Sequence, residues 1–206
     1  FNVTLIEHLA ETFETLDQKD HCRAIVLAAR GKAFCAGADF SSSGGDLFKP
    51  ESDNSAITLY RAAARLFHCR KPVVGAIQGA AIGGGLGLSL VPDFRIVCPE
   101  TRFAANFVQL GIHPGFGISL ALPRLIGQQK AQLMLLTGRR IKGEEALEYG
   151  LGDKLVPSDR VRDEAIALAT EIARCAPLAV ESTRATLRQG LAEELQARLE
   201  HEFAEQ

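Results

Sequence analysis

The sequence lacks a long apolar run and a dominant charge of either sign. No stretch reaches the roughly 18 consecutive apolar residues typical of a membrane-spanning helix, and we expect no signal peptide at its start. The 23 basic and 25 acidic side chains give a formal net charge of −2, so there is no overall attraction to nucleic acid or to an anionic membrane. We therefore expect a soluble protein that binds neither.

The sequence also lacks a CxxC pair and any set of cysteines and histidines at metal-ligand spacing. The cysteines are scattered along the chain, at Cys22, Cys35, Cys69, Cys98 and Cys175. Isolated cysteines of this kind are typical of reduced thiols in the cytosol. We therefore predict a cytoplasmic protein without a metal site.

The composition fits one globular domain. With 206 residues, 47% of them hydrophobic, the chain can bury a substantial core, and we predict a single domain over 1–206. Apolar residues at helical spacing predict helices, and short β-branched runs predict buried strands. The pattern predicts helices at 3–19, 55–68 and 119–127, strands at 22–30 and 94–98, and an almost entirely helical chain from 128 to 206.

The rest of the prediction is organised around residues 73–93. This stretch begins as an apolar β-branched strand, continues as a small-residue loop with a glycine triplet at 83–85, and becomes a helix that Pro92 stops. Glycines between a strand and a helix leave the first helical N–H groups unpaired at the positive end of the helix dipole. Such a junction stabilises a bound phosphate or a negative charge that forms during a reaction. Alternatively, the glycines only let the strand and helix pack closely, and their spacing leaves both interpretations open.

Known glycine motifs do not fit this stretch. A dinucleotide fingerprint that starts at Gly83 needs a further glycine where Leu88 stands, and a phosphate-binding loop that starts at Gly79 lacks its lysine. A nucleophile elbow needs glycine two residues before and after a serine, and neither Ser89 nor Ser119 has both. The sequence therefore argues against nucleotide-loop and serine-hydrolase chemistry.

Other segments are also candidates for a site. Residues 31–39 are small and turn-prone and follow the first strand, where α/β proteins often place their chemistry. Residues 41–54 are rich in Ser, Gly, Asp and Pro, so we predict a mobile segment that could act as a lid. Tyr60 faces inward on its helix, where core packing is favoured over catalysis. His113 stands in a glycine-rich turn, and an isolated histidine is more often structural than catalytic.

Several motifs together resemble one known family. The motifs are KAFCAGADF at 32–40, KPVVGAIQGAAIGGGLGLSLVPDFRI at 71–96, LGIHPGFG at 110–117, LPRLIG at 122–127 and LTGRRIKGEEALEYGLGDKLVP at 136–157. Their order and spacing are similar to those of the crotonase family, the enoyl-CoA hydratase/isomerase superfamily, over nearly the whole chain.

The resemblance implies a fold and partners. It implies an α/β fold, a crotonase-like spiral of ββα units over 1–156, and a helical C-terminal part over 157–206 that we expect to be incomplete. Members of this family bind acyl-CoA thioesters, with coenzyme A as part of the substrate and no separate cofactor, and usually form trimers or dimers of trimers. We therefore expect an acyl-CoA partner and a homotrimer or a dimer of trimers.

The resemblance also implies site residues. The family polarises the thioester carbonyl with two backbone N–H groups, an oxyanion hole, and its motifs place these at Ala38 and Gly84. The adenine of coenzyme A lies against the loop from Ala36 to Asp39 in such enzymes. The expected substrate contacts are Lys32, Ala36, Gly37, Asp39, Gly83 and Phe107.

This chain departs from the family at the acids. The resemblance places two hydratase glutamates at the positions of Gly87 and Phe107, and an aspartate of other members at Gly115; none of these side chains can transfer a proton. Serines at 41–43 stand where a basic residue that contacts coenzyme A is common, and we expect Lys32 or Lys49 to replace that contact.

Other polar side chains remain as candidate proton carriers near the expected pocket: His113, Tyr60 and Asn106. We rank His113 first as a base or acid, because the unperturbed pKa of histidine suits proton transfer near neutral pH. Tyr60 or Asn106 would then orient water or the substrate.

Three functions remain open from the sequence. The first is an acyl-CoA lyase or isomerase that works through a stabilised enolate with unconventional proton carriers. The second is a thioester or carbon–carbon bond hydrolase on the same scaffold. The third is a non-catalytic acyl-CoA-binding or assembly subunit. Solvent deuterium exchange beside the thioester and release of the free thiol distinguish them.

Overall fold

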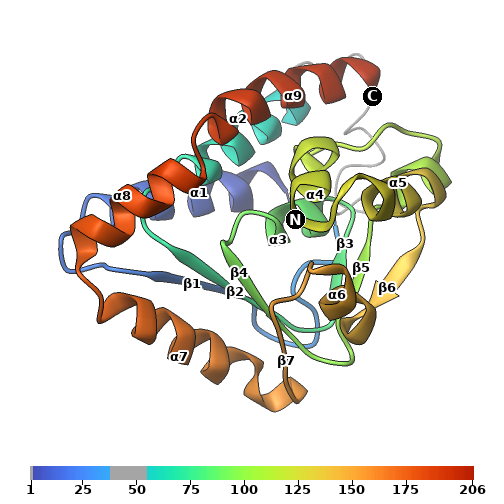
Figure 1. Cartoon of the computed structure of the whole chain (residues 1–206). Helices are drawn as coiled ribbons and strands as arrows, with labels where there is room; N and C mark the ends of the chain where they lie inside the picture. The colour runs from blue at the N-terminus through green and yellow to red at the C-terminus, as the bar shows by residue number, and fades with distance from the viewer. Residues whose placement is uncertain (1, 38–54) are drawn as a thin grey trace.

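Helices pack around two small β-sheets in the described part of the chain, residues 2–37 and 55–206 of the computed structural model (Figure 1). The strands are β1 (Ile25–Ala28), β2 (Val73–Ile77), β3 (Ala80–Ile82), β4 (Phe94–Val97), β5 (Arg102–Ala104), β6 (Arg140–Lys142) and β7 (Lys154–Leu155). The helices are α1 (Val3–Asp17), α2 (Ser55–Phe67), α3 (Gly84–Ser89), α4 (Ile118–Ile126), α5 (Gln128–Thr137), α6 (Gly143–Tyr149), α7 (Val161–Ala173), α8 (Pro177–Leu187) and α9 (Leu191–Glu205), with short 3-10 helices η2 (Asn106–Leu110) and η3 (Ser158–Arg160).

The two sheets divide the strands of the spiral between them. The larger sheet is parallel throughout, with strand order β1-β2-β4-β7. The smaller sheet has the order β3-β5-β6, with β3 parallel to β5 and β6 antiparallel to β5. Because β2 and β3 follow one another but lie in different sheets, the chain crosses between the sheets at residues 78–79, and β3 then leads into the glycine triplet.

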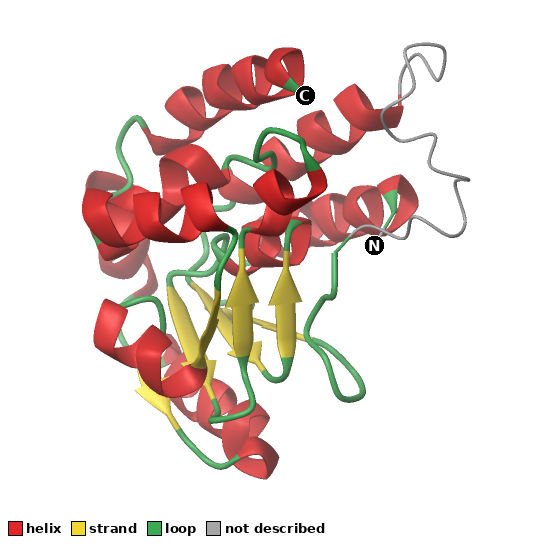
Figure 2. Cartoon of the chain, turned by 90° about the vertical axis from the view of Figure 1, so that its right-hand side faces the viewer, coloured by secondary structure: helices red, strands yellow, loops and turns green. Residues whose placement is uncertain are grey.

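The strand β2 is buried on both faces, which explains its uninterrupted small and apolar sequence. Alternate side chains of a strand point to opposite faces. Val73 and Ile77 join the main core, whereas Val74 and Ala76 pack with the apolar face of α7. Figure 1 shows α7 on one side of the larger sheet and α1, α2 and α9 on the other, and Figure 2 shows the strands between these helical layers.

Most of the predicted elements are confirmed. The helices expected at 3–19 and 55–68 are α1 and α2, and the strands expected at 22–30 and 94–98 contain β1 and β4. Tyr60 is 7% exposed and faces inward, as the spacing predicted. All five cysteines are free thiols. No helix of the described residues is long and apolar enough to cross a membrane.

Two predictions are wrong in part. The small-residue loop expected before the glycine triplet contains β3, because its backbone pairs with β5 and with Cys35. The chain after Gln128, expected to be helical almost throughout, contains β6 and β7. These strands have three and two residues, too few to reveal a period of two in the sequence. The lid expected at 41–54 lies outside the described residues.

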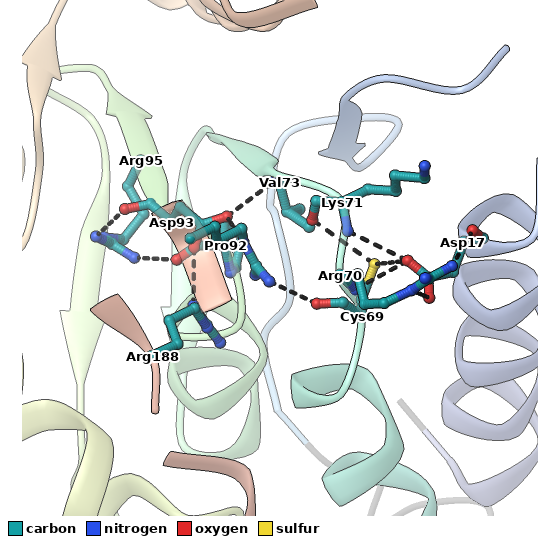
Figure 3. Close-up of polar contacts among 10 residues, drawn as sticks. Asp17, Cys69, Arg70, Lys71, Val73, Pro92, Asp93, Arg95 and Arg188 are labelled. Atoms are coloured by element: carbon teal, nitrogen blue, oxygen red, sulfur yellow. Dashed lines mark hydrogen bonds and ion pairs between the residues drawn. The ribbon is translucent and has the colours of Figure 1, made fainter. Parts of the chain in front are cut away.

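One carboxylate ties α8 to the amino ends of β2 and β4 (Figure 3). Asp93 accepts hydrogen bonds from the Val73 N–H at 2.8 Å, from Arg184 Nε at 2.8 Å and from Arg188 Nη1 at 2.9 Å. The three side chains of this network are only 11–17% exposed, so water screens their charges weakly. The network holds the end of β2 that lies away from the glycine triplet.

A second carboxylate in Figure 3 joins α1 to the start of β2. Asp17 accepts hydrogen bonds from the Arg70 N–H at 2.8 Å, from Arg70 Nε at 2.9 Å and from the Lys71 N–H at 3.2 Å. Burial raises the pKa of Asp17, but these donors outweigh it and hold the pKa below its ordinary value. The carboxylate therefore keeps its charge, and the link between α1 and β2, in mildly acidic solution.

Replacing Asp93 by asparagine is expected to lower the free energy of unfolding by about 2 kcal/mol, because two guanidinium groups lose their counter-charge in a poorly hydrated place. Urea denaturation measures the change. Asp20→Asn, at an exposed aspartate, is the matched control and should change stability by less than about 0.5 kcal/mol. Equal effects of the two substitutions would contradict the role of Asp93.

Candidate active site

The junction between β3 and α3 is the centre of the candidate site. Gly83 has φ +56, a left-handed conformation that favours glycine, and its N–H donates to the Ala104 carbonyl at 2.8 Å. Gly84 opens α3, so its N–H has no acceptor within the helix. Gly83 and Gly85 are buried, whereas Gly84 is half-buried. Of the three glycines, Gly84 is therefore the one whose backbone a ligand can approach.

The segment that leads to Gly37 is held against this junction. The Cys35 N–H donates to the Ala80 carbonyl at 2.8 Å, and the Ile82 N–H donates to the Cys35 carbonyl at 3.0 Å. A Cβ atom on Gly85 would collide with the Cys35 carbonyl oxygen and lie 2.8 Å from its carbon. Gly37, with φ +100, comes so close to Ile82 that a Cβ there would lie 2.9 Å from the Ile82 oxygen.

Two residues of the expected site, Ala38 and Asp39, follow Gly37 in the sequence and lie outside the described residues. The neighbouring Ala36 is exposed, and Gly37 is half-buried. Of the two backbone N–H groups expected to face the substrate, the described structure therefore contains that of Gly84.

The 3-10 helix η2 brings two predicted residues to Gly83. A Cβ atom on Gly83 would lie 3.4 Å from Asn106 Oδ1 and 3.8 Å from Phe107 Cζ. Phe107 is 8% exposed, and Asn106 is half-buried. One amide and one aromatic ring thus border the glycine junction, and Asn106 belongs to this group of residues.

Two other predicted residues, Tyr60 and His113, are linked by Gln206, the residue after α9. The Tyr60 hydroxyl donates to Gln206 Oε1, and Gln206 Nε2 donates to the His113 carbonyl at 2.7 Å. Burial raises the pKa of Tyr60, and the charge of Glu202 raises it further, although the bond to Gln206 opposes this rise. The Tyr60 hydroxyl therefore remains protonated at neutral pH and can donate a hydrogen bond.

The hydrogen bond of His113 decides its tautomer. Its Nδ1 atom lies 2.7 Å from the Pro114 carbonyl oxygen. Because a carbonyl oxygen only accepts hydrogen bonds, we assign the proton of the neutral ring to Nδ1. The ring is half-buried, and its centroid lies 6.0 Å from that of His201 in an edge-to-face arrangement. Nε2 is thereby the atom that can accept a proton.

Two of the positions where the resemblance implies acids have no room for a side chain. A Cβ atom on Gly87 would lie 2.6 Å from Phe116 Cδ1. A Cβ atom on Gly115 would collide with the Tyr60 hydroxyl and lie 2.9 Å from Tyr60 Cζ. The space beside each glycine is therefore taken by an aromatic residue.

The sequence analysis missed Glu202, which is 0% exposed. Its Oε2 and Oε1 atoms accept the N–H groups of Gly117 at 2.7 Å and Ser119 at 3.0 Å. Burial raises its pKa, although these donors and the charge of His113 oppose the rise. Its spacing could have indicated that Glu202 is buried, because Glu202 lies on the same face of the helix as the buried Leu195 and Leu199.

Lys32 lies apart from these groups, in a recess at the carboxyl ends of β1 and β2. The recess has a volume of about 500 Å³, and Arg102 and Arg162 line it together with Lys32. Glu100 and Asp159 also line it, so its charge is mixed. In the described part of the chain, no group of three or more His, Cys, Asp or Glu side chains is placed to hold a metal ion.

Comparisons with known proteins agree on one family. The sequence profile of the enoyl-CoA hydratase/isomerase family matches residues 1–205. A putative enoyl-CoA hydratase of Thermus thermophilus is 35% identical over 181 residues, which cover 87% of this chain and 71% of the relative. The human mitochondrial Delta(3,5)-Delta(2,4)-dienoyl-CoA isomerase is 32% identical over 198 residues, which cover 90% of this chain and 60% of the relative.

A solved structure extends the agreement to the fold. The crystal structure of an enoyl-CoA hydratase/isomerase from Pseudoalteromonas atlantica superposes with a TM-score of 0.88 at 32% identity. The match covers 100% of this chain and 80% of that one. It confirms the α/β fold expected from the motifs. This chain spans less than two thirds of the length of the human relative.

Proposed function

Because the chain belongs to the enoyl-CoA hydratase/isomerase family, we propose that it is an enzyme that binds an acyl-CoA thioester and stabilises the enolate of that thioester at the β3–α3 junction. The observation that carries the proposal is the position of Gly84. It opens α3, is half-buried between two buried glycines, and precedes Gly85, which packs against Cys35 in the segment that leads to Gly37. The N–H groups of Gly84 and Ala38 would donate to the thioester oxygen.

The physical basis is charge that develops only during the reaction. Loss of a proton from the carbon beside a thioester places negative charge on the carbonyl oxygen. N–H donors that the fold already holds in place stabilise this charge without reorganising. The hydrogen bond from the Gly83 N–H to the Ala104 carbonyl and the tight packing of Gly85 against Cys35 both support a rigid junction.

Proton transfer is the role we propose for His113. Its Nε2 atom is the acceptor of the neutral ring, because Nδ1 is bound to the Pro114 carbonyl. Tyr60, whose one O–H donates to Gln206, would orient water or the substrate through its oxygen, as a hydrogen-bond acceptor. Asn106 lies at Gly83 and would act beside the thioester instead. The residues at 87, 107 and 115 carry no acid, which supports an unconventional carrier.

Phe107, at the same junction, would border the acyl group, and Lys32 would contact the anionic part of coenzyme A. Lys32 shares its recess with Arg102 and Arg162, and these positive charges support binding of phosphate, although Glu100 and Asp159 also line the recess. Ala36, Gly37 and Asp39 would border the adenine. A homotrimer or dimer of trimers and a cytoplasmic location remain predictions, as does the absence of a separate cofactor.

Deuterium exchange tests the proposal. A panel of acyl-CoA thioesters is incubated with the protein in deuterated water, and mass spectrometry follows exchange at the carbon beside the thioester. We expect exchange with at least one acyl group, and much slower exchange when the same acyl group is carried by N-acetylcysteamine, which lacks the nucleotide. Release of free thiol without exchange would favour the hydrolase. Binding without either reaction would favour the non-catalytic acyl-CoA-binding subunit.

A further inference from the structure

The helix α9 carries a fully buried acid that the proposed reaction does not use. Acidic side chains are rarely fully buried unless they are paired. Glu202 is 0% exposed, and each of its two oxygens accepts one backbone N–H, from Gly117 and from Ser119. These donors lie 85 and 83 residues earlier in the sequence. Glu202 therefore joins α9 to the start of α4.

The contact completes the amino end of α4. Gly117 is the N-cap residue of this helix and has no side chain that could accept the first helical N–H groups. The carboxylate of Glu202, which is distant in the sequence, accepts N–H groups at this helix end instead. Its negative charge also lies at the positive end of the α4 dipole. The acid thus stabilises one particular position of the turn that precedes α4.

This turn needs an external restraint. Phe116 has φ +64 and Gly117 has φ +72, so two successive residues are left-handed. Such a conformation is costly for a phenylalanine and persists only when surrounding contacts impose it. α9 supplies contacts at both ends of the turn, since Gln206 Nε2 binds the His113 carbonyl and Glu202 binds Gly117.

The position of the turn reaches the candidate active site. Phe116 packs so closely on Gly87 that no Cβ atom would fit there, and Gly87 lies in α3, the helix that Gly84 opens. His113, the proposed proton carrier, begins the same turn. A displacement of the turn would therefore move the base and loosen the packing of α3 together.

We propose that Glu202 is a positioning residue: through the Gly117 and Ser119 N–H groups it fixes the turn from His113 to Gly117, and so aligns the base with α3. This inference rests on the proposed function for its effect on turnover. Its structural half, the restraint of the turn, does not depend on any reaction.

Two variants and two measurements test the inference. In Glu202→Gln we expect amide hydrogen exchange at Gly117 and Ser119 to quicken by about tenfold, the size expected when a helix cap is lost. We expect kcat for deuterium exchange beside the thioester to fall by a similar factor, and Kd for coenzyme A to change little. Glu202→Ala should enlarge the first two effects. If Glu202→Ala fails to fold, Glu202→Gln, which keeps the shape of the side chain, still tests the inference.

Glu205→Gln, at an exposed acid on the same helix, is the matched control and should leave all three quantities unchanged. Unchanged amide exchange in Glu202→Gln would overturn the inference. So would faster amide exchange with an unchanged kcat, because the turn would then be restrained without aligning the site. If the unmodified protein exchanges no thioester proton, the proposed function fails, and the amide exchange still tests the restraint.

Discussion

Proline in place of Gly84 is expected to slow deuterium exchange beside the thioester by about 10²–10³-fold while the protein stays folded. Gly84 is the first residue of α3, and its φ is not left-handed. Proline is well tolerated at the first helical position, since its fixed φ suits a helix and the missing N–H has no helical acceptor. The substitution therefore removes the proposed donor to the thioester oxygen and keeps a backbone that suits the start of a helix.

Alanine at the same position is the matched control. Gly84→Ala adds a Cβ atom, as proline does, but keeps the N–H group. Far-UV circular dichroism establishes that both variants are folded, and calorimetry gives their affinity for coenzyme A, which we expect to be nearly unchanged. An equal loss of turnover in both variants would assign the effect to the added carbon. Full turnover in Gly84→Pro would remove the Gly84 amide from the mechanism.

Gly85→Ala is expected to lower the free energy of unfolding by about 4 kcal/mol or more, or to prevent folding. The added Cβ atom would collide with the Cys35 carbonyl oxygen, and it would lie only 3.0 Å from Cys35 Cβ. Rotation of a side chain cannot relieve a collision with backbone. The loop that leads to Gly37 would have to move away from α3, so any folded fraction should also lose turnover.

The control for this substitution is Gly31→Ala. Gly31 has φ +85 and nothing within 4 Å of an added Cβ atom, so only its left-handed backbone opposes alanine. That penalty is about 1–2 kcal/mol. Urea denaturation compares the two variants. If Gly85→Ala costs no more than Gly31→Ala, the close approach of the Cys35 loop is not a fixed feature of the fold.

The glycine triplet illustrates how far the sequence could predict the site. Its spacing suggested either close packing or stabilisation of negative charge. In the structure the glycines differ in role: Gly83 provides a left-handed turn, and Gly85 permits contact with Cys35. Gly84 alone has the exposure that the proposed chemistry needs. A sequence pattern could not separate these roles, because they depend on contacts with distant residues, Cys35 for Gly85 and Ala104 for Gly83.

The length of an element determined whether its pattern could be read. α1 and α2 repeat apolar residues over several turns, and β2 is a continuous buried run, so local sequence predicts them. β3, β6 and β7 are too short to show a period and exist because neighbouring strands pair with them. The same limit applies to Glu202. Its acidic side chain resembles those of a solvated helix face, and only the packed structure reveals the two N–H groups that it binds.

The contact between Phe116 and Gly87 links two positions that lie far apart in the sequence. An acidic residue introduced at 87 alone would place its Cβ atom 2.6 Å from Phe116 Cδ1. It would therefore damage the fold before its carboxylate could assist any reaction. Phe116 Cβ would also lie 2.7 Å from the added Cβ atom, so even alanine at 116 would leave the position closed. An acid at 87 would therefore require the whole turn before α4, and not the ring alone, to move away from α3.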